Sequence, residues 1–455
     1  MAGDRKIMEP PKVPHPESSG VEVKERRDWR GSRVRVALRA LRHRNFRLFV
    51  AGQFISLIGT WMQSIAQSWL VYRLTGSSLL LGSVGFASQI QVFLLAPFGG
   101  MVADRYDRHR VVLVTQTLSM MLAFVLAGLT LSGAVRVWHI FLLSALLGAV
   151  NAFDIPTRQA FAIDLVGKED LVNAIALNSS MFNGARIIGP AVAGVLVAGI
   201  GEGWCFFVNG VSYVAVIIGL LMMNVRHGGS PAISGSPLSR MLEGFAFVKS
   251  ALPVRDILIL LGLVSLVGMP YSVLMPIFAE EVLHSGARGL GILMGATGIG
   301  ALFGALSLAA RRGVYGLGRW AGYSCAAFGV SLILFALSHS FLLSAALLLP
   351  VGYFMMVQMA SSNTLIQSMV PDRLRGRVMS VYSMVFIGMG PFGALFAGFM
   401  AEKFGAPATV SIGALACVAG AVVFLWRIPA LRDQARALMA AQAVLPMRPG
   451  TLSEK

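Results

Sequence analysis

The sequence predicts an all-α membrane protein with twelve transmembrane helices, arranged as two pseudo-symmetric halves of six helices each. Hydrophobic residues make up 56% of the 455-residue chain and charged residues only 13%, and the mean hydropathy is +0.72. Long apolar runs follow one another along the chain, and one polar segment separates the first six from the last six. Because a soluble fold would expose far more apolar surface than water tolerates, a bilayer is the expected solvent.

Each apolar run can cross a bilayer as one helix, which needs roughly 20 mostly apolar residues. The runs are unbroken rather than alternating, so the strands of a membrane barrel are excluded. In chain order they cover about residues 48–72, 79–103, 111–135, 137–153, 174–201, 204–225, 257–279, 289–310, 320–338, 341–366, 378–401 and 407–426.

Polar sequence flanks and divides these runs, which gives five predicted regions. They are a basic N-terminal tail over 1–45, a six-helix half over 46–225, a central loop over 226–255, a second six-helix half over 256–427 and a C-terminal tail over 428–455. The N-terminal tail lacks the apolar core of a signal peptide. Its last part, Arg33 to Arg44, interleaves apolar residues with arginines, and is either an amphipathic helix on an anionic leaflet or a solvated charge run.

The net charge of +17 raises the alternative of a nucleic-acid binder, and the placement of the basic residues excludes it. With the N-terminus in the cytoplasm, Arg186 falls inside a run and nearly all of the other basic residues fall in cytoplasmic segments. The exceptions on the outer side are Arg73, Arg136, Arg288 and Lys403. This is the positive-inside asymmetry, and it predicts a multi-pass protein with both termini in the cytoplasm and the lipid bilayer as its partner.

No enzyme or cofactor signature accompanies the apolar runs. The three cysteines, Cys205, Cys325 and Cys417, have no CxxC or Cys/His spacing and are interpreted as packing residues rather than metal ligands or disulfide partners. The chain also has no GxxxxGK[ST], HExxH or GxSxG motif. We therefore expect no ATP hydrolysis, no enzyme activity, no metal site and no cofactor.

Charge is concentrated between the second and third runs, in the segment GGMVADRYDRHR. A glycine, an aspartate four residues later and a basic cluster follow one another there: Gly100, Asp104, Arg105, Arg108 and Arg110. In loop number, predicted side and spacing, this segment resembles the signature loop of the major facilitator superfamily, which implies the two-half fold of that superfamily. Such a loop pairs its arginines with the aspartate and with helix C-termini of the opposite half, and the pairs break when the halves rock. The alternative, a loop that only enforces topology, covers the arginines but leaves Gly100 and Asp104 unexplained.

The corresponding loop of the second half, GALSLAARRGVYGLGRW, lacks the aspartate. It keeps Gly304, Arg311, Arg312 and Arg319, and Leu308 stands where the aspartate would be. A charge-based gate is therefore expected to be asymmetric and carried mainly by the first half.

The fifth run resembles the antiporter pattern of the superfamily, which places small residues and a Gly-Pro pair on one helix face. The positions are Ala185, Gly189, Pro190, Ala193 and Gly194, with alanines in place of several glycines of the pattern. Small residues allow close helix approach and the proline bends the helix. Within the superfamily this pattern accompanies export.

Residues 45–86 and 151–161 resemble the bacterial branch that contains the enterobactin-type siderophore exporters. The resemblance implies a monomeric secondary transporter of a bacterial inner membrane that exports a small, siderophore-like or drug-like solute by alternating access with proton antiport. Ser144 stands where many proton-driven drug antiporters of the superfamily carry arginine, so coupling through that arginine is excluded. An importer of the same fold, a channel and a non-transporting receptor remain as alternatives.

Three charges fall inside or at the end of the predicted spans: Asp154, Arg158 and Arg186. Asp154 and Arg158 share a helix face by their spacing, and Asp154 with Arg186 is a second potential pair. Because embedded charge is costly in a bilayer, this trio is either coupled to transport or a structural ion-pair network. Glu280 and Glu281, at the outer end of the seventh run, are either proton carriers at a cavity mouth or solvated helix-end residues.

Spans one, four, seven and ten line the central cavity in the superfamily, so the resemblance implies a set of cavity candidates. They are Gln63, Gln67, Asn151, Tyr271, Tyr353 and Gln358. Each of them is also able to serve only as an interhelical hydrogen-bond partner. As a set they predict a mostly apolar, weakly polar cavity for an amphipathic or aromatic solute.

Overall fold

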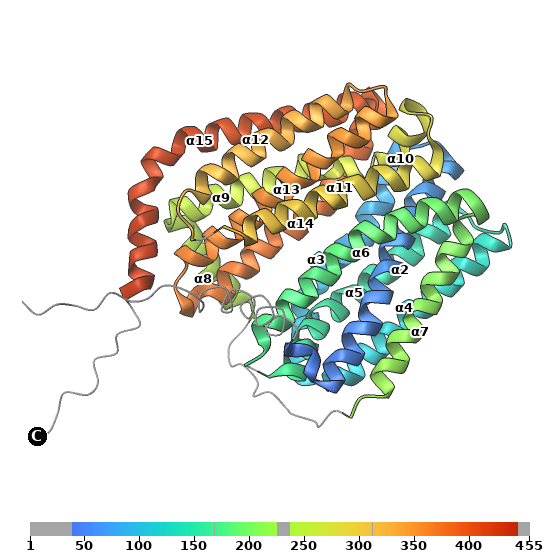
Figure 1. The fold of residues 1–455 in the computed structure, drawn as a ribbon, viewed down its shortest axis with the longest axis horizontal. Helices are drawn as coiled ribbons and strands as arrows, with labels where there is room; N and C mark the ends of the chain where they lie inside the picture. Colours follow the sequence, from blue (N-terminus) through green and yellow to red (C-terminus); the bar gives the residue numbers. More distant parts are fainter. Residues whose placement is uncertain (1–38, 168, 225–236, 312, 445–455) are drawn as a thin grey trace, which may run out of the picture.

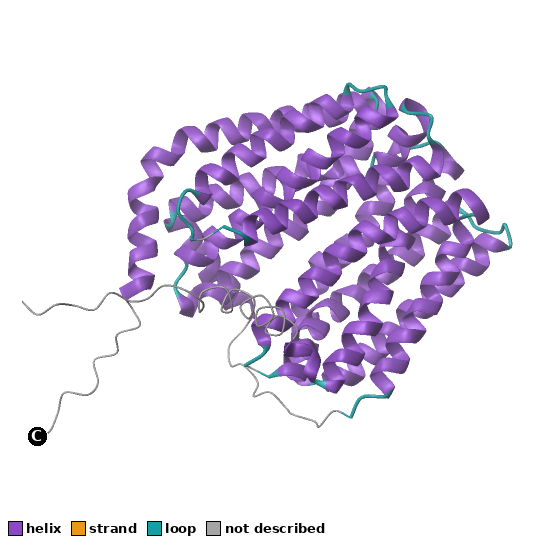
Figure 2. Ribbon diagram, viewed as in Figure 1, coloured by secondary structure: helices purple, strands orange, loops and turns teal. Residues whose placement is uncertain are grey.

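The computed structural model describes residues 39–167, 169–224, 237–311 and 313–444 (Figure 1). Within these ranges the chain folds into helices joined by short loops and contains no strand (Figure 2). Twelve helical segments are long and apolar enough to span a membrane, one for each predicted run. The predicted fold class, an all-α membrane protein with twelve spans in two halves, is confirmed.

The described first half comprises one short 3-10 helix and six spans. These are η1 (Arg39–Arg42), α2 (Arg44–Thr75), α3 (Ser78–Arg105), α4 (Arg108–Leu131), α5 (Val137–Val166), α6 (Leu171–Ile200) and α7 (Glu202–Leu221). The second half follows α8 (Pro237–Ser250). Its seventh span is built from α9 (Leu252–Leu263), η2 (Val264–Gly268), η3 (Met269–Ser272), α10 (Met275–Ile277) and η4 (Phe278–Val282), and the remaining spans are α11 (Gly286–Ala309), α12 (Leu317–Ala336), α13 (Phe341–Met369), α14 (Asp372–Phe404) and α15 (Ala406–Val444).

The spans alternate in direction, so the bundle has two distinct ends. We call the end that carries η1, α8 and the C-terminus of α15 the terminal end, and the opposite end the far end (Figure 1). The basic residues predicted for the outer side, Arg73, Arg136, Arg288 and Lys403, all belong to the far end, because each lies where a span starts or finishes there.

Two pairs of helices join the halves: α3 packs against α14, and α6 packs against α11. Glycines allow both approaches. A Cβ added to Gly82 would lie 2.9 Å from the Cα of Gly398, and one added to Gly194 would lie 3.0 Å from the Cα of Gly291. Small residues therefore bring the backbones of the two halves into direct contact, as is typical of helix pairs in membranes.

The seventh span is not one regular helix, although its sequence forms a single apolar run. Two π-helical turns and a 3-10 turn interrupt it between Val264 and Val282. Pro270 and Pro276 lie in this stretch and lack the N–H group that a regular helix needs. The interruption holds Tyr271 in a buried position on η3.

Two helical segments lie in regions expected to be loop or tail. Helix α8 falls in the predicted central loop and packs on α14, where a Cβ on Gly244 would lie 2.7 Å from the carbonyl oxygen of Arg377. Helix α15 continues through Pro429 to Val444, well into the predicted C-terminal tail. The remaining parts of that loop and tail, 226–236 and 445–455, lie outside the described residues.

The end of the basic N-terminal tail docks on the first half. Arg39 Nε lies 3.0 Å from an oxygen of Asp170, and His43 Nε2 lies 2.9 Å from the other oxygen of the same carboxylate. Residues 33–38 of the predicted amphipathic segment lie outside the described residues. The described part is thus held by protein contacts at the N-terminus of α6.

Candidate functional site

The charged loop of the first half lies at the terminal end, between α3 and α4. Asp107 caps α4, because its side chain accepts hydrogen bonds from the backbone N–H groups of His109 and Arg110. The Arg108 side chain turns back: its Nε donates to the carbonyl of Ala103 at 3.0 Å. The loop is therefore a fixed turn with Arg108 directed at its own half.

Arg108 has two acidic partners, and the stronger one is not in the loop. Its Nη1 donates to both carboxylate oxygens of Asp164, at 2.9 and 2.8 Å. Its Nη2, by contrast, lies 3.9 Å from Oδ1 of Asp104. Asp164 belongs to the last turn of α5, which runs beyond the predicted end of its span. The sequence reasoning missed it, although three charges on one helical extension, at 154, 158 and 164, were a signal for it.

The remaining members of the predicted gate are exposed. Arg105 and Asp104 face away from the core, and Arg110 lies 3.8 Å from Asp107. In the described part of the chain, every hydrogen bond and ion pair of Arg108 stays within the first half. Arg108 thus has no partner in the opposite half among the described residues in this conformation.

Gly100 has open space where a side chain would start, since no heavy atom lies within 4 Å of a Cβ built there. Its neighbour Gly99 is the packed glycine: a Cβ at that position would lie 2.0 Å from the carbonyl oxygen of Ala152. Close packing of α3 on α5 thus requires a glycine at 99 and does not require one at 100.

The loop of the second half uses its arginine locally. The Arg311 guanidinium lies 4.7 Å from the centre of the Trp320 ring and donates to the carbonyl of Tyr315. Leu308 packs against the core, and Arg312 lies outside the described residues. This loop therefore has no acidic partner among the residues described.

Asp154 is a buried carboxylate with three donors around it. Arg158 Nε lies 3.1 Å away, and the side chains of Thr115 and Gln116 on α4 donate at 2.8 and 2.9 Å. The predicted pairing of Asp154 with Arg158 is present. The other predicted pairing, with Arg186, is not found, because the carboxylate faces α4 and its acceptor positions are already occupied.

The second half carries a neutral version of this pair. Gln358 lies the same number of residues after the start of α13 as Asp154 does after the start of α5. Its Nε2 donates to the Ser362 hydroxyl at 3.4 Å, and Ser362 stands at the position that corresponds to Arg158. The Gln358 Oε1 atom is buried without a partner. The charge asymmetry predicted for the loops thus extends into the spans.

Arg186 occupies the middle of α6, far from the other embedded charges. Its guanidinium lies 5.8 Å from the centre of the Trp61 ring on α2 and interacts electrostatically with Tyr271 of the second half. Among the described residues it has no ion pair or hydrogen bond from its side chain. The structure therefore separates Arg186 from Asp154 and Arg158 and places it beside the boundary between the halves.

The antiporter-like positions of α6 pack on two sides. A Cβ on Gly189 would lie 2.5 Å from the Trp61 Cβ, and Gly194 approaches Gly291 of α11. Ala185 and Ala193 are fully buried. The carbonyl of Pro190, which is inside the helix, lies against Gly291.

Two of the predicted cavity glutamines, Gln63 and Gln67, form interhelical hydrogen bonds. Gln63 accepts from Asn209 of α7 at 2.7 Å, and Gln67 donates to the hydroxyl of Ser144 on α5 at 2.8 Å. Ser144, at the place of the antiporter arginine, is thus a partner of Gln67. Asn151 is half-buried, and no hydrogen bond of its side chain is found in the described part.

Tyr353 is also half-buried, and its backbone packs on α11. Tyr271 is 3% exposed, and its ring packs edge-on against Phe328 at 6.4 Å. Of the six cavity candidates, Tyr271 is the one that lies close to Arg186.

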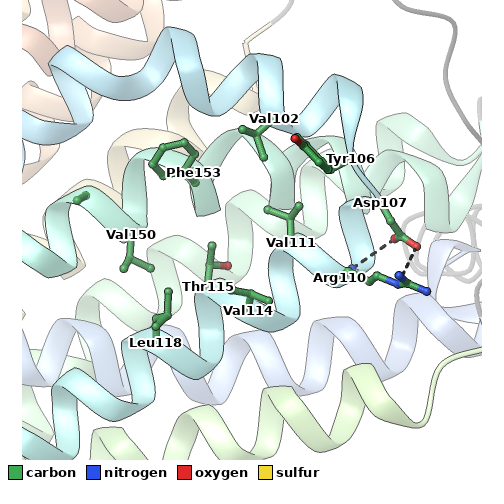
Figure 3. Close-up of a pocket in the computed structure, with 11 residues that line it drawn as sticks. Val102, Tyr106, Asp107, Arg110, Val111, Val114, Thr115, Leu118, Val150 and Phe153 are labelled. Atoms are coloured by element: carbon green, nitrogen blue, oxygen red, sulfur yellow. Dashed lines mark hydrogen bonds and ion pairs between the residues drawn. The ribbon is translucent and has the colours of Figure 1, made fainter.

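A cavity of about 590 Å³ lies under the charged loop (Figure 3). It is mostly apolar and is lined by α3, α4 and α5 alone. Asp107 and Arg110 lie at its terminal end, and Val114 and Leu118 are exposed at its wall. Because all of its lining residues belong to the first half, it is distinct from the boundary between the halves.

The halves are hydrogen-bonded to each other at the far end. The Tyr72 hydroxyl donates to Glu281, and the Ser77 hydroxyl and the Leu79 N–H both donate to Glu402 at 3.1 Å. These are the inter-half hydrogen bonds of the described residues, and none lies at the terminal end. Glu281 was a predicted residue, whereas Tyr72 and Glu402 were missed because neither forms a motif.

Comparison with known proteins identifies the type of molecule. The sequence profile of the family described as transmembrane secretion effector matches residues 36–448. The staphyloferrin A transporter of Staphylococcus aureus is 27% identical, with 83% of this chain and 94% of that protein covered. The enterobactin exporter EntS of Citrobacter koseri and the multidrug efflux pump Tap of Mycolicibacterium fortuitum are each 25% identical, with 86% and 82% of this chain and 93% of each relative covered.

Solved structures agree on the fold. A bacterial homologue of the iron transporter ferroportin, solved in an inward-facing state, superposes with a TM-score of 0.64 at 18% identity and covers 84% of this chain and 98% of its own. The relatives are transporters and not enzymes. On the match over nearly its whole length, this chain is a multi-pass membrane transporter of the major facilitator superfamily and belongs to its transmembrane secretion effector family.

Proposed function

We propose that this transporter exports a small organic solute from the cytoplasm by alternating access. The observation that carries the proposal is the position of the inter-half hydrogen bonds, which among the described residues lie at the far end. Among the described residues, Arg108 of the charged loop at the terminal end bonds only within the first half. This is the arrangement expected of a carrier that is closed on one side of the membrane and free to open on the other.

The orientation follows from charge. Basic residues are strongly enriched at the terminal end, and cytoplasmic loops carry such an excess. On this orientation both termini are cytoplasmic, and the conformation is closed to the outside. A cytoplasmic solute would then enter between the halves and leave after the far-end contacts have opened.

Two observations favour export over import. The small-residue face of α6, with Gly189, Pro190 and Gly194, packs directly on α2 and α11, and this pattern accompanies export in the superfamily. Relatives of similar length are named as an exporter of enterobactin and as a multidrug efflux pump. The solute class that fits both is a small organic molecule with polar and apolar parts.

Proton antiport is the coupling that we propose, with Asp154 and Arg158 as the embedded pair that carries it. They are the charged pair at a position where the second half has the neutral Gln358 and Ser362. Ser144 cannot replace the arginine of other antiporters, because its hydroxyl has no charge and accepts from Gln67. Coupling through Asp154 would give this chain a proton site that does not depend on the arginine found in other antiporters.

Flux in inside-out membrane vesicles tests the proposal. The full chain is expressed, the vesicle lumen is made acidic, and uptake of a panel of siderophores, dyes and antibiotics is measured. We expect at least one solute to accumulate, and a protonophore to abolish the accumulation. Accumulation that survives collapse of both the pH gradient and the membrane potential would reject proton antiport, and the absence of uptake for the whole panel would reject export of this solute class.

A further inference from the structure

Arg186 is a charged side chain at the middle of a transmembrane helix, and it has no counter-charge among the described residues. Helix α6 runs from Leu171 to Ile200, so Arg186 lies close to the bilayer centre when the helix spans it. A charge at this depth is costly and marks a functional site unless a partner neutralises it. The next question is whether the protein supplies that partner.

Three acidic side chains of the described spans already have a basic partner. Asp154 is paired with Arg158, and Asp256 lies 3.0 Å from Arg427. At the far end, Glu202 is paired with Arg73. Within the described part of the chain, no carboxylate lies within ion-pairing distance of Arg186. The part of the chain that the structure describes therefore leaves this cation uncompensated.

The surroundings of Arg186 are aromatic and lie between the two halves. Trp61 lies under the guanidinium at 5.8 Å, and its ring meets that of Phe182 edge-on at 5.7 Å. Phe182, one helical turn nearer the terminal end, is 46% exposed. On the other side, a Cβ on Gly298 of α11 would lie 3.1 Å from the Arg186 carbonyl, and Tyr271 interacts electrostatically with the guanidinium.

We propose that Arg186 binds a carboxylate group of the transported solute, and that the flat apolar part of the solute packs beside Trp61 and Phe182. A planar guanidinium matches a carboxylate with two parallel hydrogen bonds, which a lone aromatic ring cannot supply. Transporters of this general plan bind solutes near the bilayer midplane, where the halves meet. The proposal rests on the proposed function, since it assigns the substrate class of that transporter: organic anions with an aromatic or other planar portion.

Cation–π contact with Trp61 does not replace an anion in this position. Such contacts stabilise a cation by less than an ion pair does, and they leave its net charge in place. A bound carboxylate would cancel that charge. The loaded site would then hold no excess charge at the bilayer centre while the halves rock. Tyr271 belongs to the second half, so the surroundings of Arg186 include residues of both halves.

Equilibrium binding to the purified full-length chain tests the proposal. The probes are two matched pairs: 2-naphthoate with 2-naphthamide, and citrate with its neutral trimethyl ester. Binding is followed by the shift in thermal unfolding temperature and by tryptophan fluorescence. We expect the carboxylate of at least one pair to bind wild-type protein and its neutral counterpart to bind more weakly, because only the carboxylate is able to neutralise the guanidinium.

The variants locate the effect. Arg186→Gln should weaken carboxylate binding by more than about tenfold and remove the preference over the neutral probe. Arg186→Lys, which keeps the charge and loses the fork, should fall between the two. Arg288→Gln, which removes an exposed charge at the far end, is the control and should bind as wild type does.

Three results would overturn the proposal: undiminished carboxylate binding by Arg186→Gln, equal binding of charged and neutral probes by wild type, or no binding of either carboxylate. Because binding is measured without a gradient, these results are independent of flux. A chain that binds carboxylates through Arg186 but moves nothing in vesicles would contradict the proposed function alone.

Discussion

Asp104 and Asp164 share one partner, Arg108, and this sharing determines what the charged loop is able to do. In the present conformation Arg108 holds Asp164 closely and Asp104 loosely. Asp104 is half-exposed at the terminal end, where the halves make no hydrogen bond among the described residues. In the proposed alternating-access cycle, Asp104 is thus available to a new partner when that end closes, whereas Asp164 keeps the loop attached to α5.

The residue-scale prediction compares Asp104→Asn with Leu308→Asn. Loss of the Asp104 charge removes its attraction to Arg108 and to partners in the closed state, and should lower solute flux about tenfold. Leu308→Asn alters a position that has no charge to lose and should leave flux within about twofold of wild type. Vesicle uptake, normalised to the amount of each protein, measures both. Equal tolerance of the two changes would reduce the loop to a topology signal.

A second residue-scale prediction uses the neutral pair of the second half as a template. Asp154→Gln alone leaves Arg158 without its carboxylate and should destabilise the protein by about 2 kcal/mol, since the arginine is partly exposed. Adding Arg158→Ser recreates the Gln358–Ser362 arrangement and should recover most of that loss. Thermal unfolding in detergent measures the stability of both variants.

Transport by the same double variant tests coupling. If Asp154 and Arg158 carry the proton, the double variant should move solute down its gradient without responding to an imposed pH gradient. A double variant that still accumulates solute against a gradient, in proportion to the pH difference, would show that the proton travels elsewhere.

At the scale of elements, sequence predicts the spans well and their irregularities poorly. Unbroken apolar runs identify all twelve spans because lipid forces each run to satisfy its backbone internally. Hydropathy does not reveal the π-helical and 3-10 turns around Pro270. It also does not predict helix α8, because the proline and serine residues near it indicate a loop. Hydropathy also does not predict that Asp164 lies on α5, because the polar continuation of a span has no hydropathy signal that marks where the helix ends.

Partners of single residues are harder still to predict. The spacing of Asp154 and Arg158 is local, so their pairing follows from helix geometry. The isolation of Arg186 depends on how the helices of the first half are rotated about their axes. No sequence pattern within α6 predicts that rotation. Gln63 and Gln67 share a face in sequence and bond to different helices in space.

The element-scale prediction concerns the packing of α3 on α5. Gly99→Ala would place a Cβ against the Ala152 carbonyl, and backbone has little freedom to move away. We expect a loss of about 1–3 kcal/mol in the free energy of unfolding, as for other overpacked sites. Gly100→Ala is the matched control, with open space and a helical backbone, and should be neutral or stabilising by up to about 1 kcal/mol. Thermal unfolding of both variants checks this, and equal destabilisation would contradict the packing assignment.

At the scale of the whole molecule, the two halves are joined along α3–α14 and α6–α11, and the hydrogen bonds across that joint between described residues lie at the far end. The glycine contacts at Gly82 and Gly194 are smooth surfaces over which helices are able to rock, because they contain no side chain to interlock. On this view, the hydrogen bonds of Tyr72, Glu281 and Glu402 hold the two halves together at the far end. Releasing them should shift the molecule toward the opposite conformation.

Alternating access is the central claim, and paired distances measured by electron paramagnetic resonance test it most directly. One spin-label pair replaces Tyr106 and Tyr315, exposed residues of the two halves at the terminal end; the other replaces Trp138 and Leu342 at the far end. The three native cysteines are buried and are replaced by alanine in the background. Both pairs are compared with and without Tyr72→Phe, Glu281→Ala and Glu402→Ala, which remove the donor to Glu281 and the acceptor of Ser77 and Leu79.

Alternating access predicts that the two distances change in opposite directions. With the far-end hydrogen bonds removed, a longer Trp138–Leu342 distance and a shorter Tyr106–Tyr315 distance should appear in the same fraction of molecules. A far-end distance that lengthens while the terminal-end distance stays unchanged would contradict the account, because it would describe a pore open at both ends rather than a carrier.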